Sequence, residues 1–160
     1  MAKNFLEIEN VTFAASAKSK VNNVSLTIEN EGDIICLLGP SGIGKTTILR
    51  TIAGLEKIQS GKIILKNKII SSKDYHVEPE NRNISLAFQD NSLFPHYNVI
   101  QNIQFGADRN KKKDKSLTID EVIKFLHLEH IKEKFPHQIS SGEAQRAALA
   151  RALLSKPDLL

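Results

Sequence analysis

A glycine-rich loop followed by a lysine and a threonine is the segment of this chain best suited to bind phosphate. Residues 39–46 read Gly-Pro-Ser-Gly-Ile-Gly-Lys-Thr and match G-x-x-x-x-G-K-[ST] at every fixed position. Glycines let successive backbone N–H groups point into one concavity that holds an anion. Lys45 would reach the outer phosphates of a nucleotide, and the hydroxyl of Thr46 would bind Mg²⁺. The predicted nucleotide contacts are Gly39, Pro40, Ser41, Gly42, Ile43, Gly44, Lys45, Thr46 and Thr47.

The elements around the loop support this interpretation over a chance glycine turn, which average composition would produce only about once in 200 such chains. The apolar run Ile34–Leu38 predicts a central strand covered on both faces. Apolar residues at helical spacing predict a helix over 45–56, whose N-terminal end would face the phosphates. Strands are predicted near 5–13 and 24–29, and a strand–turn–strand over 61–70.

The second half of the chain is predicted to be mostly helical, after a short apolar strand at 84–88. A helix is expected near 99–106. Two capping boxes, Thr118-x-x-Glu121 and Ser140-x-x-Glu143, open further amphipathic helices. The order of elements predicts an α/β fold with an antiparallel part and a helical part.

Composition is typical of a soluble globular domain: 160 residues, 41% hydrophobic and 25% charged, with a net charge of 22 − 18 = +4. The longest apolar run has five residues, far short of a membrane span. The N-terminus has no apolar segment typical of a secretory signal. The single cysteine, Cys36, excludes an internal disulfide and is expected in the core. The lysines of 111–115 are interpreted as a solvated loop, not a nucleic-acid site, because no aromatic residue lies among them.

A second motif, Ile-Ser-Ser-Gly-Glu-Ala-Gln-Arg at 139–146, begins about 95 residues after Lys45. It resembles the Leu-Ser-Gly-Gly-Gln signature of ATP-binding cassette (ABC) proteins. Gln89, at the end of an apolar segment, resembles the family's Q-loop glutamine, and Phe13 the aromatic that stacks on adenine. The resemblance implies a P-loop NTPase core with an antiparallel β subdomain and a helical subdomain that carries the signature. The expected divisions are about 1–90 for the core, about 91–154 for the helical subdomain and 155–160 for the entry to a further strand.

The same resemblance assigns roles to these residues, with ATP and Mg²⁺ as cofactors. Thr46 and Gln89 would bind Mg²⁺. The signature would contact the ATP of a partner subunit through Ser140, Ser141, Gly142, Glu143 and Gln145. Ser141 replaces the family's usual glycine and Glu143 its usual glutamine, but the capping box should turn Glu143 back toward the helix backbone.

The resemblance also implies that the chain is an incomplete ABC ATPase domain. In the family, the signature helix leads into a strand that ends in Asp-Glu, and that glutamate polarises the attacking water. This sequence ends at 156–160 (Lys-Pro-Asp-Leu-Leu). The expectation is therefore that the chain contains no catalytic base and does not turn over ATP by itself.

Residues 79–84, 88–96 and 102–106 resemble importer ATPases of the ferric-iron, polyamine, sulfate and maltose group, with ferric iron the preferred solute and the others kept as alternatives. The implied partners are transmembrane permease subunits, a periplasmic or lipid-anchored substrate-binding protein and a second ATPase subunit, at the cytoplasmic face of the cell membrane. Phe94 and Pro95 either dock on the permease or only pack a loop. There are two alternative functions. A non-transport ABC protein acting on DNA or ribosomes would need a long coiled-coil insert or a second cassette, and neither is present in these 160 residues. A P-loop kinase or GTPase would not need the signature at Ser140.

Overall fold

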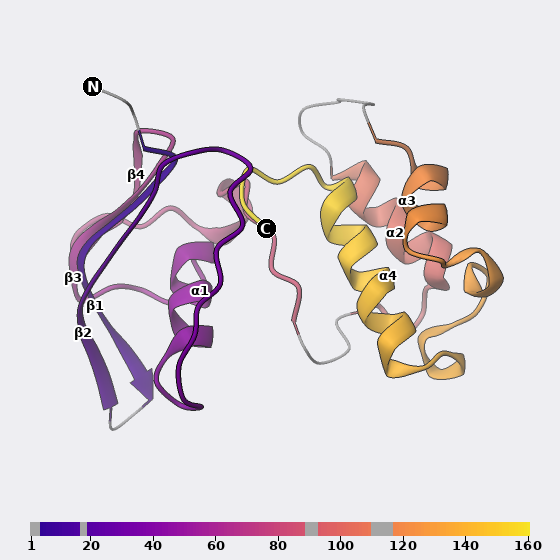
Figure 1. Ribbon diagram of the computed structural model, residues 1–160, viewed down its shortest axis with the longest axis horizontal. Helices are drawn as coiled ribbons and strands as arrows, with labels where there is room; N and C mark the ends of the chain where they lie inside the picture. Colours follow the sequence, from indigo (N-terminus) through magenta and orange to yellow (C-terminus); the bar gives the residue numbers. More distant parts are fainter. Residues whose placement is uncertain (1–3, 17–18, 89–92, 110–116) are drawn as a thin grey trace. The chain divides into compact units, whose positions relative to one another are not determined.

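A computed structural model describes residues 4–16, 19–88, 93–109 and 117–160, which belong to two compact units (Figure 1). Unit 1 comprises Met1–Arg82 and unit 2 comprises Asn83–Leu160. In the ranges that the structure describes, unit 1 contains strands and one α-helix, whereas unit 2 contains mainly helices. The chain thus has the predicted α/β character, with the strands first and the helices later in the sequence.

Unit 1 is organised by a four-stranded antiparallel sheet in the order β2-β1-β3-β4. The strands are β1 (Leu6–Ser16), β2 (Ser19–Ile28), β3 (Ser60–Leu65) and β4 (Lys68–Ser72). In β1, Leu6 and Ile8 are buried while Glu7 between them is partly exposed, which is the period of two that a half-buried strand requires. The predicted N-terminal strands and the predicted strand–turn–strand are confirmed.

Helix α1 (Lys45–Ala53) packs against β1 and begins directly after the glycine-rich loop (Figure 1). Its buried face contains Ile48 and Ile52, as their spacing predicts. The helix ends earlier than expected, because Gly54 adopts φ 90° and its N–H bonds to the carbonyls of Arg50 and Thr51. The short 3₁₀ helix η1 (Pro79–Asn81) lies near the end of the unit.

The predicted buried strand at Ile34–Leu38 is wrong for this structure. These residues form no strand, and Ile34 and Leu38 are 98% and 87% exposed. Cys36, expected in the core, is exposed as well. A strand exists only where a neighbour satisfies its backbone groups, and β2 and β4 form the two edges of the sheet without pairing to this segment. Apolar character alone therefore did not produce a strand.

Unit 2 is a helical bundle of α2 (Val99–Asp108), α3 (Ile119–Phe125) and α4 (Ser141–Leu154), joined through the 3₁₀ helices η2 (Glu129–Ile131) and η3 (Pro136–Gln138). Its core combines Ile and Leu side chains of the first helices with the alanines of α4. Helices α2 and α4 pack so closely that a Cβ at Gly106 would meet the backbone carbonyl of Arg151. The three predicted helices are confirmed, and α3 ends at Phe125.

The predicted strand at 84–88 is reduced to a single parallel bridge between Ile84 and Leu159. The N–H of Ser85 donates to the carbonyl of Leu159 at 3.0 Å, and the N–H of Asp158 donates to the carbonyl of Asn83 at 2.7 Å. The last residues of the chain therefore lie alongside the first residues of unit 2.

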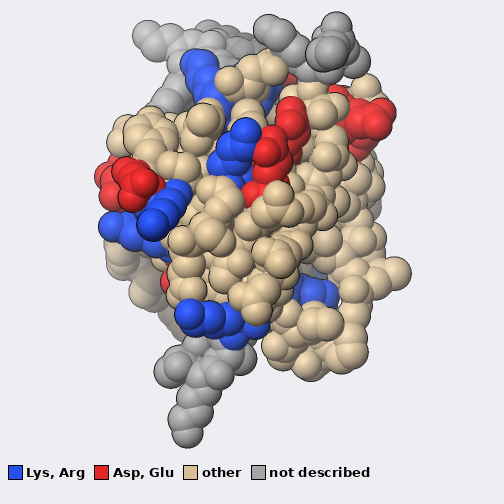
Figure 2. Space-filling model, turned by 90° about the vertical axis from the view of Figure 1, so that its left-hand side faces the viewer, with Lys and Arg blue, Asp and Glu red and all other residues tan. Residues whose placement is uncertain are grey.

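Charges of both signs are interspersed on the face drawn in Figure 2 instead of gathering into a patch of one sign. Lys62 pairs with Glu9 and Lys66 with Glu31, each at 3.1 Å. Among the described residues, no helix is long and apolar enough to cross a membrane. The lysine run at 111–115 lies outside the described residues.

Candidate nucleotide-binding site

The glycine-rich loop between Leu38 and α1 curls because its glycines adopt conformations that other residues rarely accept. Gly42 has φ 82° and Gly44 has φ 104°, both in the left-handed region. Gly44 is also the residue that caps the N-terminus of α1. Ser41, Gly42 and Ile43 are exposed, so the loop presents its backbone to an incoming ligand.

Lys45 is directed into the loop. Its Nζ donates to the carbonyl of Gly39 at 2.6 Å and to the carbonyl of Pro40 at 2.7 Å. The ammonium is therefore held inside the curve of the loop, at the entrance to α1. A phosphate oxygen in that concavity would replace neutral carbonyl partners with a charged one, which makes a stronger hydrogen bond.

The first turn of α1 adds further donors for an anion. Ile48 N–H donates to the carbonyl of Gly44 at 2.9 Å, and the preceding N–H groups of the helix have no acceptor within it. No acidic residue occupies this turn, and Gly44 supplies no capping side chain. Thr46 is exposed, so its hydroxyl is accessible as a metal ligand. These donors fit a nucleotide phosphate with Mg²⁺.

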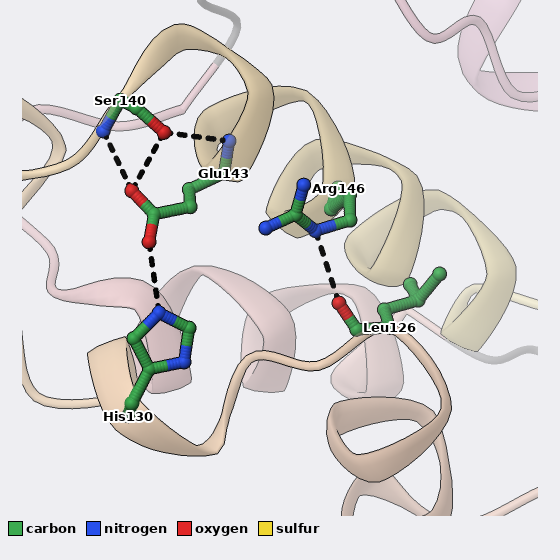
Figure 3. A network of polar contacts seen from close by, with 5 residues as sticks. All are labelled: Leu126, His130, Ser140, Glu143 and Arg146. Atoms are coloured by element: carbon green, nitrogen blue, oxygen red, sulfur yellow. Dashed lines mark hydrogen bonds and ion pairs between the residues drawn. The ribbon is translucent and has the colours of Figure 1, made fainter.

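The start of α4 in unit 2 is organised by a complete capping box (Figure 3). Glu143 N–H donates to Oγ of Ser140 at 3.3 Å. In return, Oε2 of Glu143 accepts from N and from Oγ of Ser140, at 2.8 and 2.7 Å. The expectation that Glu143 turns back toward the helix is therefore confirmed.

These contacts strongly favour the ionised form of Glu143. The hydrogen bonds from the Ser140 side chain and backbone, with a further one from His130, lower the pKa of Glu143 from 4.5 to about 2. At neutral pH the signature segment thus carries a full negative charge next to a helix N-terminus. Of the other signature residues, Ser141 and Gln145 are exposed and Gly142 is partly exposed.

His130, which the sequence analysis did not single out, contacts the signature segment. Its Nε2 donates to Oε1 of Glu143 at 2.9 Å, although the two residues come from η2 and α4 (Figure 3). Arg146, one turn further along α4, donates from Nε to the carbonyl of Leu126 at 3.0 Å. No local pattern signals either contact, because both join segments that are separate in the sequence.

Phe13 and Gln89 are two predicted nucleotide contacts that lie outside the glycine-rich loop in the sequence. Phe13 lies in β1 and is only 1% exposed, so neighbouring side chains would have to move before its ring could stack on a base. Its role stays a prediction. Gln89 lies outside the described residues, so its role also stays a prediction.

A buried asparagine that the sequence analysis did not single out holds the segment 94–97 in place. Asn102 of α2 is fully buried and bonds with Nδ2 to the carbonyls of Phe94 and Tyr97, at 3.2 and 3.0 Å. The Phe94 ring is partly exposed and stacks edge-on against Phe105, with centroids 4.9 Å apart. Phe94 therefore packs a local aromatic cluster, while Pro95 beside it is exposed.

Comparison with known proteins agrees with these features. The ABC transporter family model matches residues 21–160. The spermidine/putrescine import ATP-binding protein PotA of Shigella dysenteriae serotype 1 is 44% identical over 145 residues, which are 89% of this chain and 37% of PotA. PotA of Escherichia coli strain K12 gives the same identity and coverage. The chain thus spans little more than a third of the length of these curated relatives.

Solved structures show the same fold. The ATP-binding cassette MJ0796, in a dimeric post-hydrolysis state bound to ADP and Pi, has a TM-score of 0.75 at 27% identity, with 95% of this chain and 70% of that chain covered. CbiO1 from Clostridium perfringens, part of an ABC transporter complex, has a TM-score of 0.72 at 29% identity, with 96% and 62% covered. The chain therefore belongs to the ABC transporter family.

Proposed function

We propose that this chain supplies the nucleotide-binding part of an ABC import ATPase, which couples ATP hydrolysis to solute uptake. The observation that carries the proposal is the position of Lys45, whose ammonium lies inside a glycine loop at the N-terminus of α1. A cation, aligned backbone N–H groups and an exposed threonine hydroxyl together favour a polyphosphate with its metal ion over other ligands.

The residues of this loop would bind and orient the phosphates. Lys45 would exchange the carbonyls of Gly39 and Pro40 for phosphate oxygens, and the first N–H groups of α1 would donate to the same anion. Thr46 would hold Mg²⁺, with Gln89 as a second proposed ligand. Bound Mg²⁺ would supply positive charge that offsets the negative charge developing during phosphoryl transfer. Phe13 is retained as a proposed adenine contact that depends on side-chain movement.

The start of α4 would serve the nucleotide of a second subunit. The first backbone N–H groups of α4 would donate to an anion, and the hydroxyl of Ser140 would exchange its contact with Oε2 of Glu143 for a phosphate oxygen. In the proposed dimer, two subunits meet head-to-tail, so that each ATP lies between Lys45 of one and Ser140 of the other. The dimeric state named for MJ0796 supports the proposal that two subunits associate.

The solute is proposed to be a polyamine. The sequence-based preference for ferric iron receives no support from the relatives, whose names specify spermidine and putrescine import. The polyamine alternative is therefore preferred.

The partners would be membrane permease subunits and a substrate-binding protein, with the ATPase at the cytoplasmic face of the cell membrane. The exposed Pro95 segment is proposed as the region that docks on the permease.

Titration with a fluorescent ATP analogue tests the nucleotide site. Lys45→Ala should weaken binding at least about tenfold, or about 1.4 kcal/mol, because no backbone amide replaces its charge. Lys57→Ala is the control, because it removes an exposed lysine that follows α1 in the sequence. This variant should bind the ATP analogue as tightly as the unaltered chain does. Equal affinity of all three proteins would contradict the proposed site.

Uptake by cells tests the solute separately. Deleting the gene should abolish uptake of radiolabelled spermidine and leave ferric-iron uptake unchanged, and restoring the gene should restore spermidine uptake. Loss of iron uptake with normal spermidine uptake would overturn the choice of solute while leaving the nucleotide site intact.

A further inference from the structure

Both oxygens of the Glu143 carboxylate are engaged, and they are held by different segments (Figure 3). Oε2 accepts from the backbone N and the Oγ of Ser140 at the start of α4. Oε1 accepts from Nε2 of His130 in η2, at 2.9 Å. The capping box needs only the first set of contacts, so the histidine contact requires a separate explanation.

The position of His130 is determined by the core of unit 2, although 62% of its side chain is exposed. Its neighbours Leu128 and Ile131 are 0% and 1% exposed, and Ile131 N–H donates to the carbonyl of Leu128 at 3.1 Å. Arg146 ties the preceding carbonyl, that of Leu126, to α4. The imidazole is therefore presented to Glu143 by a fixed backbone and not by a freely moving loop.

A carboxylate at this helix end conflicts with the proposed function, because the partner's ATP would bring a phosphate to the same N-terminus and like charges repel. Ser140 alone cannot resolve the conflict, since its N–H and hydroxyl both serve Oε2. The N–H of His130 donates to Oε1, which orients the carboxylate toward η2. This charge-assisted hydrogen bond also stabilises the negative charge of the carboxylate.

We propose that His130 is a positioning residue for the signature: by holding Oε1 of Glu143 it keeps that carboxylate directed toward η2, which leaves the start of α4 open to phosphate. This inference rests on the proposed function, because the phosphate is that of the partner subunit's ATP. It also explains how Glu143 stands where the family's usual residue is an uncharged glutamine.

The test is a set of variants measured in the chain extended to the length of its curated relatives and assembled with its membrane subunits. His130→Ala should raise the KM for ATP about threefold with kcat little changed, the size expected for a partly exposed pair. His130→Gln, which retains an N–H donor, should recover most of that loss. In a Glu143→Gln background, His130→Ala should have no further effect on KM. His127→Asn, which alters another exposed histidine of the same segment, should behave like the unaltered protein.

The carboxyl ¹³C resonance of Glu143 provides a readout that does not depend on ATP. His130→Ala should shift this resonance, while the Glu143 amide stays protected from exchange because the capping box persists. An unchanged KM in His130→Ala would overturn the inference. If His130→Ala raised KM equally in the Glu143→Gln background, the inference would also be overturned. The effect would then come from the packing of η2 and not from the contact with Glu143. Normal ATP turnover in Lys45→Ala would instead reject the proposed function. The Glu143 resonance would still report on the contact between His130 and Glu143, so the two failures can be distinguished.

Discussion

Arg82 donates from Nη2 to Nδ1 of His76 at 3.2 Å, and this contact determines where the imidazole carries its proton. Because Nδ1 accepts, the hydrogen must be on Nε2, which lies 3.1 Å from the carbonyl of Gly54 and donates to it. A long-range ¹H–¹⁵N spectrum should therefore show His76 as the Nε2–H tautomer at neutral pH. The opposite tautomer would contradict the contact.

Arg82 is the centre of this network and is only 4% exposed. Its guanidinium donates to the carbonyls of Thr51 and Ile52 at the end of α1, and to the carbonyl of Ile70 and Oγ of Ser71 in β4. Burial lowers its pKa to about 10, an effect that the charge of Glu78 partly opposes. The residue remains charged at neutral pH, and its donors satisfy the last carbonyls of the helix that follows the glycine loop.

Arg82→Lys should lower the free energy of unfolding by about 3 kcal/mol, because a lysine cannot replace the planar fork of donors and leaves buried carbonyls unpaired. Denaturant unfolding followed by circular dichroism measures this. Arg50→Lys is the matched control, since Arg50 pairs with Glu56 at a partly exposed position. Equal losses in the two variants would show that Arg82 has no special role.

Gly106→Ala should destabilise unit 2 by about 2 kcal/mol, because the added Cβ meets the backbone carbonyl of Arg151 and forces α2 and α4 apart. Gly142→Ala is the control: it adds the same methyl group to α4, where the nearest atom, Nη1 of Arg146, is 3.8 Å away. Thermal unfolding should show a lower Tm for the first variant only. A Tm that rises in both would mean that helix propensity outweighs the close packing.

The capping box at Ser140 should persist in acid. Because folding lowers the pKa of Glu143 from 4.5 to about 2, ionised Glu143 contributes stability that is fully present above about pH 4.5 and is lost as the pH falls toward 2. NMR titration of its carboxyl carbon should give a midpoint near 2, and Ser140→Ala should move that midpoint toward 4.5. A midpoint near 4.5 in the unaltered protein would show that the capping box is not formed in solution.

Ser140→Arg should separate nucleotide binding within one subunit from ATP-dependent dimerisation. In the chain extended to the length of its curated relatives, this variant should bind a fluorescent ATP analogue normally through Lys45 and fail to dimerise on ATP addition. The bulky, charged side chain would obstruct the helix end offered to the partner's phosphate. Light scattering with and without ATP measures the dimer. Lost nucleotide affinity with normal dimerisation would mean that the signature acts within one subunit.

Features that depend on nearby residues could be predicted from the sequence alone. The capping boxes at Thr118 and Ser140 require residues three positions apart, so their hydrogen bonds follow from local geometry. The glycine loop and the buried face of α1 were predictable for the same reason. The motif spacing also identified the family, which the comparison with ABC transporters confirmed.

Contacts between separate segments were decided only by the tertiary structure. Nothing near Glu143 in the sequence predicts that His130 binds its second oxygen, and nothing near Arg82 predicts that it serves carbonyls 30 and 31 residues away. The apolar run Ile34–Leu38 shows the converse: its composition favours a buried strand, yet it is exposed, because a strand depends on neighbours that hydrogen-bond to it and cover it. Local patterns specify what a segment can form, and packing decides which partners it has.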